Sequence, residues 1–212
     1  MSILHITNGD YFNEYFLSRH GGIAVPFCEV MMDGDTISEI YSDAFIRLRA
    51  GALGINTAEY RAKMHAYKAM TTTQHDVLCL WFGKDTFCQA NLLTLLAYLE
   101  QIGYSGTVLL NYIDDETFDI IEEKIPVKLG LYKGLYEDIL VAKKPPSDCG
   151  VLIGEAFDLY FDYHSDNGRL ARLLREHSEM TDAALLCLLL QNSGAYGLSD
   201  RQAMRLIEKY RK

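Results

Sequence analysis

Several short apolar runs in this sequence end in polar residues whose side chains could bind a ligand or move protons. Close carboxylates raise one another's pKa or hold a divalent cation. A histidine beside an aspartate is a suitable pair for proton transfer. These residue types predict a site for a small molecule, a nucleotide or a phosphate, with hydrolase or transferase activity as the reaction class. The candidate residues, in chain order, are His5, Asn8, Gly9, Asp10, Glu29, Lys84, Asp85 and Gln89.

The candidates divide into two roles. We expect three catalytic residues: His5 and Asp10 would handle protons or orient the reacting group, and Asp85 would supply negative charge or a metal ligand. Glu29 could share the role of Asp85. The sequence specifies no cofactor, although these carboxylates could hold a divalent cation. The residues expected to bind the ligand are Asn8, Gly9, Glu29, Lys84 and Gln89.

Each candidate also has a purely structural interpretation. Asp10 and Asp85 are well placed to cap helices, and such caps stabilise a protein by roughly 0.5–2 kcal/mol each. Gly9 could serve only to allow a tight turn. A histidine inside an apolar strand, such as His5, is more often a core residue than a catalytic one. The functional hypothesis therefore depends on these side chains converging in one crevice.

The elements that must position these residues follow from hydrophobic periodicity. Continuous apolar runs predict strands, and i, i+4 spacing predicts helices. Their alternation with short connections is typical of parallel β-α-β units, whose ligands bind beyond the carboxyl ends of the strands. Asp114 and Asp115 predict the start of a further helix. The predicted strands are 3–7, 23–27, 76–82 and 107–113, with 126–131 as a candidate fifth, and the predicted helices are 11–19, 36–50, 56–70 and 86–102.

The predicted fold class is α/β, with an open, mostly parallel, Rossmann-like sheet, flanking helices and an all-helical C-terminal appendage. The composition changes near residues 143–146, so we place the α/β domain at residues 1–146 and the helical extension at 147–212. Ser199 and Gln202 have the spacing of a capping box at the start of the last helix. The helices predicted in the extension are 152–163, 170–176, 182–191 and 199–209.

Composition limits the partners and the compartment. The net charge of −9 and the pI of about 5.1 argue against nucleic-acid binding, because an acidic surface repels phosphate backbones. The five cysteines include no C-x-x-C pair, which favours a reducing cytoplasm. The chain start does not resemble a signal peptide, and no apolar window is long enough to span a bilayer. We therefore expect a soluble cytoplasmic protein without a membrane partner.

The best-known sequence motifs for nucleotide, zinc and serine-hydrolase sites are absent from this chain. It contains no G-x-G-x-x-G fingerprint, Walker loop, H-E-x-x-H or G-x-S-x-G motif. The candidate site therefore has to be argued from the positions of its residues along the predicted sheet.

Three short motifs resemble the bacterial family called domain of unknown function 1835. The resemblance covers about residues 2–113, and the helical tail resembles an extension often attached to that domain. It implies site positions but names no reaction. Glu29 stands where many relatives have Asp, and Gly34-Asp35 stands where Gly-Pro is common. The motifs are His5-Ile-Thr-Asn-Gly9-Asp10, Pro26-Phe-Cys-Glu29 with Gly34 following, and Trp81-Phe-Gly-Lys-Asp85-Thr-Phe-Cys-Gln89, and the implied positions are His5, Gly9, Asp10, Glu29, Asp85 and Gln89.

Two other classes of function stay open from the sequence. A non-catalytic regulatory or interaction protein would use the helical tail, whose aromatic residues Phe157, Tyr160, Phe161 and Tyr163 could dock a partner or a second copy. The sequence therefore leaves a homo-oligomer open as one alternative. A DNA-binding regulator would use a helix-turn-helix near residues 194–200, but this region lacks the dense basic face that phosphate contacts need.

Overall fold

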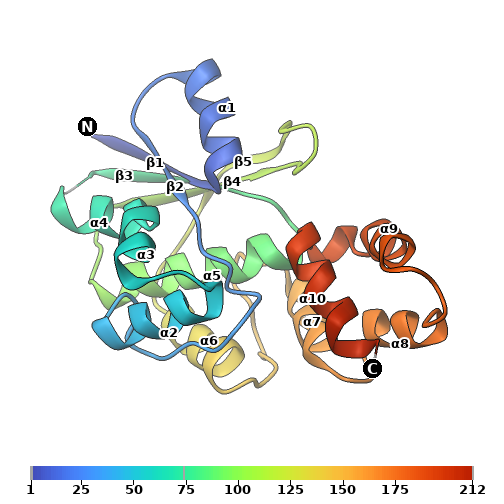
Figure 1. Ribbon diagram of the computed structural model, residues 1–212. Helices are drawn as coiled ribbons and strands as arrows, with labels where there is room; N and C mark the ends of the chain where they lie inside the picture. The colour runs from blue at the N-terminus through green and yellow to red at the C-terminus, as the bar shows by residue number, and fades with distance from the viewer. Residues whose placement is uncertain (1, 74, 212) are drawn as a thin grey trace.

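One five-stranded sheet organises the chain (Figure 1). The structure is a computed structural model that describes residues 2–73 and 75–211. The strands lie in the order β2-β1-β3-β4-β5; the first four are parallel to one another, and β5 is antiparallel to β4. The predicted α/β class with a mostly parallel sheet is confirmed. The strands are β1 (Ile3–Asn8), β2 (Ala24–Phe27), β3 (Val77–Phe82), β4 (Thr107–Ile113) and β5 (Ile120–Pro126).

The edge strand β5 differs from the expectation of a strand over 126–131. It begins and ends earlier and runs antiparallel, because an antiparallel neighbour can follow β4 after only a short turn. Most of its residues are exposed, and Glu122, Glu123 and Lys124 lie in its centre. Charged side chains on an edge strand discourage pairing with another chain.

Asp114 and Asp115 do not begin a helix, contrary to the prediction. They lie in the turn between β4 and β5, where Asp114 Oδ1 accepts the amides of Glu116 at 3.0 Å and Thr117 at 2.8 Å. The amide of Asp114 also donates to the carbonyl of Asp119 at 2.9 Å. An aspartate that bonds its own following backbone favours a turn over a helix. The turn reverses the chain and lets β5 pair with β4.

Helices cover the two faces of the sheet unequally: α1 lies on one side, and α2 to α6 lie on the other (Figure 1). The helix predicted over 36–50 begins only at Asp43, since a long loop precedes it. The helix predicted over 56–70 begins with a capping box at Asn56 but is interrupted at Met64. The helices are α1 (Asp10–His20), α2 (Asp43–Leu53), α3 (Thr57–Lys63), α4 (His65–Thr72), α5 (Thr86–Gln101) and α6 (Tyr132–Tyr136), followed by the π-helical turn η1 (Glu137–Val141).

Two hydrophobic clusters follow from this arrangement. The main core lies between the sheet and α2 to α6 and continues into the C-terminal helices. On the other face, Phe12 and Phe16 of α1 pack against Trp81 and Ile113 of the sheet. No helix in the described part of the chain has the length and apolarity needed to cross a membrane.

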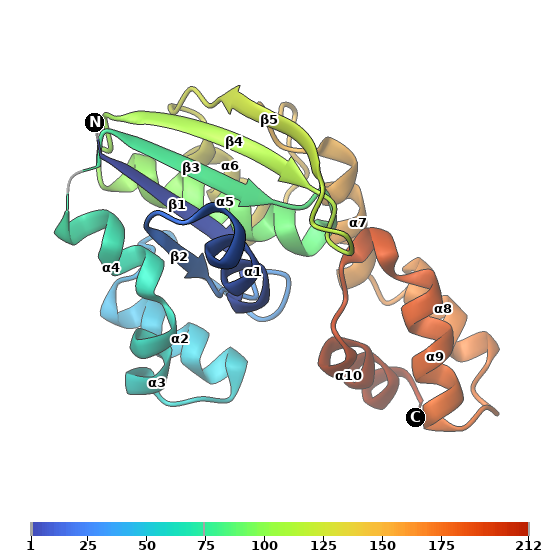
Figure 2. The same cartoon turned by 90° about the horizontal axis from the view of Figure 1, so that it is seen from above.

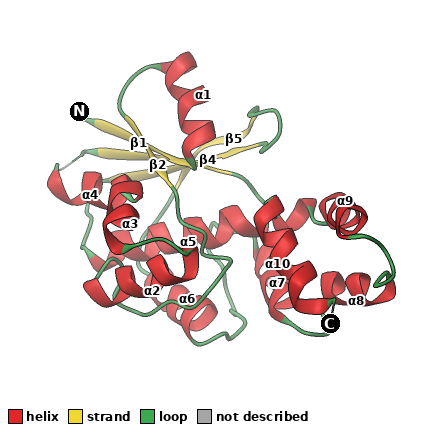
Figure 3. Cartoon of the chain, viewed as in Figure 1, coloured by secondary structure: helices red, strands yellow, loops and turns green. Residues whose placement is uncertain are grey.

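The C-terminal region is helical, as predicted, and its described residues contain no strand (Figure 3). Figure 2 shows β3 and β4 pointing toward it, so it lies beyond the carboxyl ends of these strands. Thr86 Oγ1 donates to the carbonyl of Ala195 at 3.1 Å, and the Tyr112 hydroxyl donates to that of Val151 at 2.7 Å. The elements are α7 (Gly154–His164), α8 (Arg169–Glu176), α9 (Asp182–Asn192), the 3-10 turn η2 (Gly194–Tyr196) and α10 (Asp200–Tyr210).

Candidate functional site

The strand order reverses between β1 and β3, which marks the edge where a ligand is expected. The chain passes from β1 to β2 on one side and then returns to β3 on the other side of β1. In open α/β sheets, ligands bind outside the carboxyl ends of the strands at such a reversal. Asn8 ends β1, and Gly83 directly follows β3. The C-terminal helices face this edge (Figure 2).

Asn8 connects the end of β1 to α5. Its Nδ2 donates to Cys88 Sγ at 2.8 Å, and its Oδ1 accepts from Asn91 Nδ2 at 3.0 Å. Asn91 is fully buried; it also donates to the Glu29 carbonyl at 2.6 Å and accepts the Met31 amide at 3.0 Å. One amide side chain of α5 therefore fixes both the end of β1 and the loop after β2.

Asp85, Cys88 and Asp115 meet at the ends of β3 and β4, and we call them the Asp-Cys-Asp cluster. One possible ligand atom from each residue lies within 4.8 Å of the other two. Cys88 Sγ is 3.3 Å from Asp85 Oδ2 and 3.4 Å from Asp115 Oδ1. Asp85 also caps α5 as predicted, since its Oδ1 accepts the amide of Cys88 at 2.7 Å. The structural and functional interpretations of Asp85 are thus compatible.

Two glycines leave room for the carboxyl groups of this cluster. A Cβ atom at Gly83 would overlap the Asp115 carboxyl oxygens, and one at Gly197 would overlap the Asp85 carboxyl group. Gly83 lies at the end of β3, whereas Gly197 lies in the C-terminal region, just before α10. Segments far apart in the sequence therefore close around the same two carboxyl groups.

The electrostatics of the cluster favour bound protons when no cation is present. The Asp115 side chain is exposed as a whole, but its carboxyl group lies against Gly83; burial of that group and then the charge of Asp85 raise its pKa to about 8. Burial, followed by the Asp85 and Asp115 charges, raises the pKa of Cys88 well above its ordinary value. Lys84 offers no compensation, because its ammonium pairs with Glu122.

The separations within the cluster match those of ligands around a small divalent ion. A tetrahedral site with Zn–S of about 2.3 Å and Zn–O of about 2.0 Å places sulfur and oxygen about 3.5 Å apart. The two Cys88 sulfur-to-oxygen separations are 3.3 and 3.4 Å. A thiolate with two carboxylates suits zinc or a similar transition metal better than magnesium, which prefers oxygen ligands and water.

A cavity of about 400 Å³ adjoins the cluster, and we call it the acidic cavity. It lies between the β4-β5 turn, α7 and η2. Asp85 and Asp115 line it, whereas Cys88 is buried behind them. Its lining residues are Lys84, Asp85, Ile113, Asp114, Asp115, Glu116, Ile121, Ile153, Glu155, Ala156, Leu159, Gly194 and Ala195.

A second cavity, of about 280 Å³, lies at the ends of β1 and β2, and we call it the switch-point cavity. Asn8 lines this cavity and also contacts Cys88, so it connects the switch-point cavity to the Asp-Cys-Asp cluster. Helices of the α/β region and helix α10 of the C-terminal region both contribute to the cavity wall. Its lining residues are Asn8, Gly9, Asp10, Phe27, Cys28, Glu29, Val30, Leu53, Ile55, Lys63, Phe87 and Arg201.

Glu29 has a structural position that the sequence did not reveal. Its side chain is fully buried, lies 3.5 Å from the Arg49 guanidinium and accepts a hydrogen bond from the Tyr60 hydroxyl. Arg49 in turn donates to the carbonyls of Asp33 at 2.6 Å and Val30 at 2.7 Å. This ion pair organises the loop after β2, so the Glu29 carboxylate is not available as a ligand for a bound molecule.

Gln89 is also occupied by the fold. It is fully buried; its Nε2 donates to the Gly83 carbonyl at 2.7 Å, and its Oε1 accepts the Ile153 amide at 3.0 Å. Gln89 therefore ties the end of β3 to the residue preceding α7.

Lys84 lines the acidic cavity, where its ammonium also lies 5.1 Å from the centroid of the Tyr112 ring.

His5 lies apart from the other candidates. Its Nδ1 accepts a hydrogen bond from Trp81 Nε1 at 3.0 Å, and its ring lies 4.8 Å from that of Phe16. Burial, and then the nearby His20, lowers its pKa. His5 belongs to the α1 face of the sheet, so the prediction that it would share a crevice with Asp85 is wrong.

Gly9 and Asp10 both line the switch-point cavity. Gly9 is the N-cap of α1, with φ of 86° and ψ of 164°, a region essentially restricted to glycine. Asp10 is the first helical residue and not the cap; its exposed carboxylate accepts a hydrogen bond from Cys28 Sγ at 3.3 Å. The expectation that Asp10 caps the helix is wrong, whereas its position at the predicted edge is open to a ligand.

Several residues of the site were not among the predicted ones. Cys88 and Asn91 lie within the predicted helix 86–102 and were assigned no role there, and Asp115 was predicted to begin a helix. Lys63 and Arg201 come from α3 and α10, whose position at the strand ends no local pattern indicates. Two local signals were present: Asn91 is a polar residue in a mostly apolar helical stretch, and Asp115 closely follows the predicted strand 107–113.

The aromatic residues of the tail are used mainly inside the molecule. Phe157 and Tyr160 are buried, and Phe161 and Tyr163 are partly buried against the main core. The Tyr163 hydroxyl donates to Asp33 Oδ1 at 2.7 Å. These residues attach the tail to the loop after β2, so they do not form an exposed docking face.

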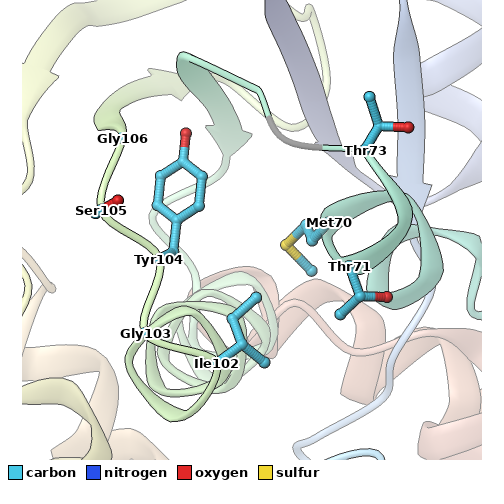
Figure 4. Close-up of a pocket in the computed structure, with 8 residues that line it drawn as sticks. All are labelled: Met70, Thr71, Thr73, Ile102, Gly103, Tyr104, Ser105 and Gly106. Atoms are coloured by element: carbon cyan, nitrogen blue, oxygen red, sulfur yellow. The ribbon is translucent and has the colours of Figure 1, made fainter.

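A further cavity of about 280 Å³ lies at the opposite end of the sheet (Figure 4). It is bounded by the C-terminal part of α4 and the connection between α5 and β4. Figure 4 shows Tyr104, Ser105, Thr71 and Thr73 around it, with Met70 and Ile102. None of its lining residues is charged, so we do not place the site there.

Comparisons of the chain with protein-family models, with curated proteins and with solved structures find no match. The resemblance to domain of unknown function 1835 therefore stays a prediction.

Proposed function

We propose that this chain binds a small molecule at the carboxyl ends of its parallel strands, and that a divalent metal ion held by Asp85, Cys88 and Asp115 forms part of the site. The observation that carries the proposal is the convergence of three donor atoms within 4.8 Å beside a cavity of about 400 Å³. Zinc is the ion that this donor set suits best.

The glycines around the cluster support the proposal. Without the space above Gly83 and Gly197, the two carboxyl groups could not approach the Cys88 sulfur so closely. Asn8 donates to the same sulfur at 2.8 Å, which resembles the outer hydrogen bonds that orient metal ligands. A cation would replace the protons that the cluster otherwise holds.

The reaction class follows from an ion with three protein ligands and a side open to the cavity. Such an ion polarises a phosphoryl or carbonyl oxygen, or activates water near neutral pH. We therefore propose a metal-dependent hydrolase or transferase. Asp85 and Asp115 would hold the ion with Cys88, and the ion would face the acidic cavity that both carboxylates line.

A metal titration tests the proposal. Protein freed of metal with a chelator would be titrated with Zn²⁺, Mn²⁺ and Mg²⁺ by calorimetry at pH 8. We expect tight binding of one Zn²⁺ and weak binding of Mg²⁺. Asp85→Asn should weaken Zn²⁺ at least tenfold while keeping the helix cap, because Asn caps helices as well as Asp. Cys88→Ser should also weaken it.

Asp114→Asn is the matched control. It removes one charge from the same cavity but no ligand atom of the cluster, and Asn keeps the Oδ1 acceptor of the turn. Zn²⁺ binding to this variant should stay within about twofold of wild type. Equal weakening by Asp114→Asn and Asp85→Asn would show diffuse attraction to an acidic surface and would refute the metal site. Release of phosphate from phosphate esters, with and without Zn²⁺, tests the reaction class separately.

A further inference from the structure

The switch-point cavity contains two cations without an acidic partner. Within residues 2–73 and 75–211, neither Lys63 nor Arg201 forms an ion pair. Arg201 Nη2 donates to the Leu53 carbonyl at 3.3 Å, which leaves other donors of its guanidinium free. Both cations line one cavity at the carboxyl ends of the strands, in a chain whose net charge is −9.

The start of α1 adds donors for an anion at the same place. Gly9 is the N-cap and has no side chain to accept the first amides of the 11-residue helix, whereas α5 is capped by Asp85. Uncapped first-turn amides and the helix dipole favour a negative group. Gly9 and Asp10 line the cavity together with the two cations. An anionic group is therefore the expected occupant of this end.

The rest of the wall is apolar. Phe27, Leu53, Ile55 and Phe87 line it, and all but the buried Phe27 are partly exposed. Phe87 and the two aliphatic residues can contact the face of a flat ring. The Asp10 carboxylate, which would repel an anion, can instead accept hydrogen bonds from hydroxyl groups. The cavity thus combines an anion site, a hydroxyl acceptor and an apolar wall.

We propose that the switch-point cavity binds a nucleoside monophosphate. Lys63 and Arg201 would hold the phosphate, Asp10 the sugar hydroxyls, and Phe87 with its aliphatic neighbours the base. The volume of about 280 Å³ is near the lower end of ligand cavities, roughly 300–1,000 Å³, and suits a mononucleotide better than a dinucleotide. Any reaction of this ligand rests on the proposed function, but its binding does not need the metal ion.

The test is calorimetric titration of the full chain with AMP, GMP, CMP and UMP at low salt in the presence of EDTA. We expect at least one of them to bind, and adenosine or the matching nucleoside to bind at least tenfold more weakly. Inorganic phosphate should compete at higher concentration. Lys63→Gln and Arg201→Gln should each weaken binding about tenfold, since each removes a charge-assisted contact to phosphate.

Lys68→Gln is the matched control, because Lys68 is an exposed cation of α4 outside the cavity. It should leave the affinity within about twofold of wild type. The proposal is overturned if no monophosphate binds at millimolar concentration, or if Lys68→Gln weakens binding as much as the cavity variants. Asp85→Asn separates the two proposals: in EDTA it should bind the monophosphate normally, even if the metal site fails its own test.

Discussion

Gly83→Ala is the sharpest perturbation of the Asp-Cys-Asp cluster, because it changes no titratable residue. Gly83 does not have a positive φ, so its backbone accepts alanine. The new Cβ would occupy the space of the Asp115 carboxyl oxygens and force that group away from Asp85 and Cys88. The Asp115 side chain lies on an exposed turn and can move. The variant should therefore remain folded while losing one of three metal ligands.

The expected loss of metal affinity is large compared with the change in stability. Altering an outer hydrogen-bond partner of a metal ligand costs roughly 10–100-fold in affinity. Displacing a ligand itself should cost at least about 100-fold, or about 2.8 kcal/mol. The free energy of unfolding should change by less than about 1 kcal/mol, since replacing Gly by Ala at a compatible position stabilises by about 0.4–1 kcal/mol and offsets the displacement. The pKa of Asp115 should fall from about 8 toward its ordinary value.

Three measurements decide the outcome: Zn²⁺ competition with a colorimetric chelator, urea unfolding without metal, and carboxyl carbon NMR of Asp115 as a function of pH. Gly51→Ala is the control, since an added Cβ there meets nothing within 4 Å. A folded Gly83→Ala protein with wild-type Zn²⁺ affinity would refute the assignment of Asp115 as a ligand. An unchanged pKa of Asp115 in Gly83→Ala would refute the proposed contact between the Asp115 and Asp85 carboxyl groups.

Other predictions address protons and the buried ion pair. Zn²⁺ affinity should rise steadily from pH 6 to 8.5, because the raised pKa values of Asp115 and Cys88 mean that the ion must displace their protons; calorimetry in buffers of different ionisation enthalpy would count the protons released. Without metal, the folded state holds a proton on Asp115 between pH 3.8 and about 8 that the unfolded state lacks, so the contribution of Asp115 to stability should fall as pH rises through this range. Asp115→Asn should remove this contribution, so the melting temperature of wild type relative to Asp115→Asn should be higher at pH 5 than at pH 8. Glu29→Gln should destabilise the fold by about 3–5 kcal/mol in urea unfolding, because it leaves Arg49 as an unpaired buried charge, whereas Asp43→Asn, at an exposed ion pair, should cost less than about 1 kcal/mol.

The sequence predicted the parts of the fold that depend on local patterns. Continuous apolar runs identified β1, β2, β3 and β4, and their alternation with helices identified the parallel sheet. The predicted caps at Asp85 and Ser199 were also correct, because a cap depends on residues only three positions apart. Asp85 was found as a site residue because it lies only three residues after the end of a predicted strand.

The wrong predictions about site residues have two causes. Some residues meet only through contacts between distant segments, and the alternation of side chains along a strand was not applied to His5. Asp115 was assigned to a helix start, since acidic residues there look the same as those in a hairpin turn until β5 is known to pair with β4. Cys88 was not predicted as a site residue, because its partner Asn8 is 80 positions away in the sequence. The sequence alone could have excluded His5 as a site residue beside Asn8, because residues 5 and 8 of one strand point to opposite faces of the sheet.

The helical tail, residues 147–212, is predicted from the sequence as an appendage, whereas in the structure it contributes residues to both cavities. Gly197 closes over Asp85, Ala195 accepts a hydrogen bond from Thr86, and Arg201 completes the wall of the switch-point cavity. A truncation at residue 147 would remove part of both cavities and expose the buried start of α5, so loss of function would follow under every hypothesis. Single substitutions discriminate better. Arg201→Gln leaves the tail attached through its buried aromatic residues, and a specific loss of nucleotide binding in that variant would identify the tail as one wall of the site.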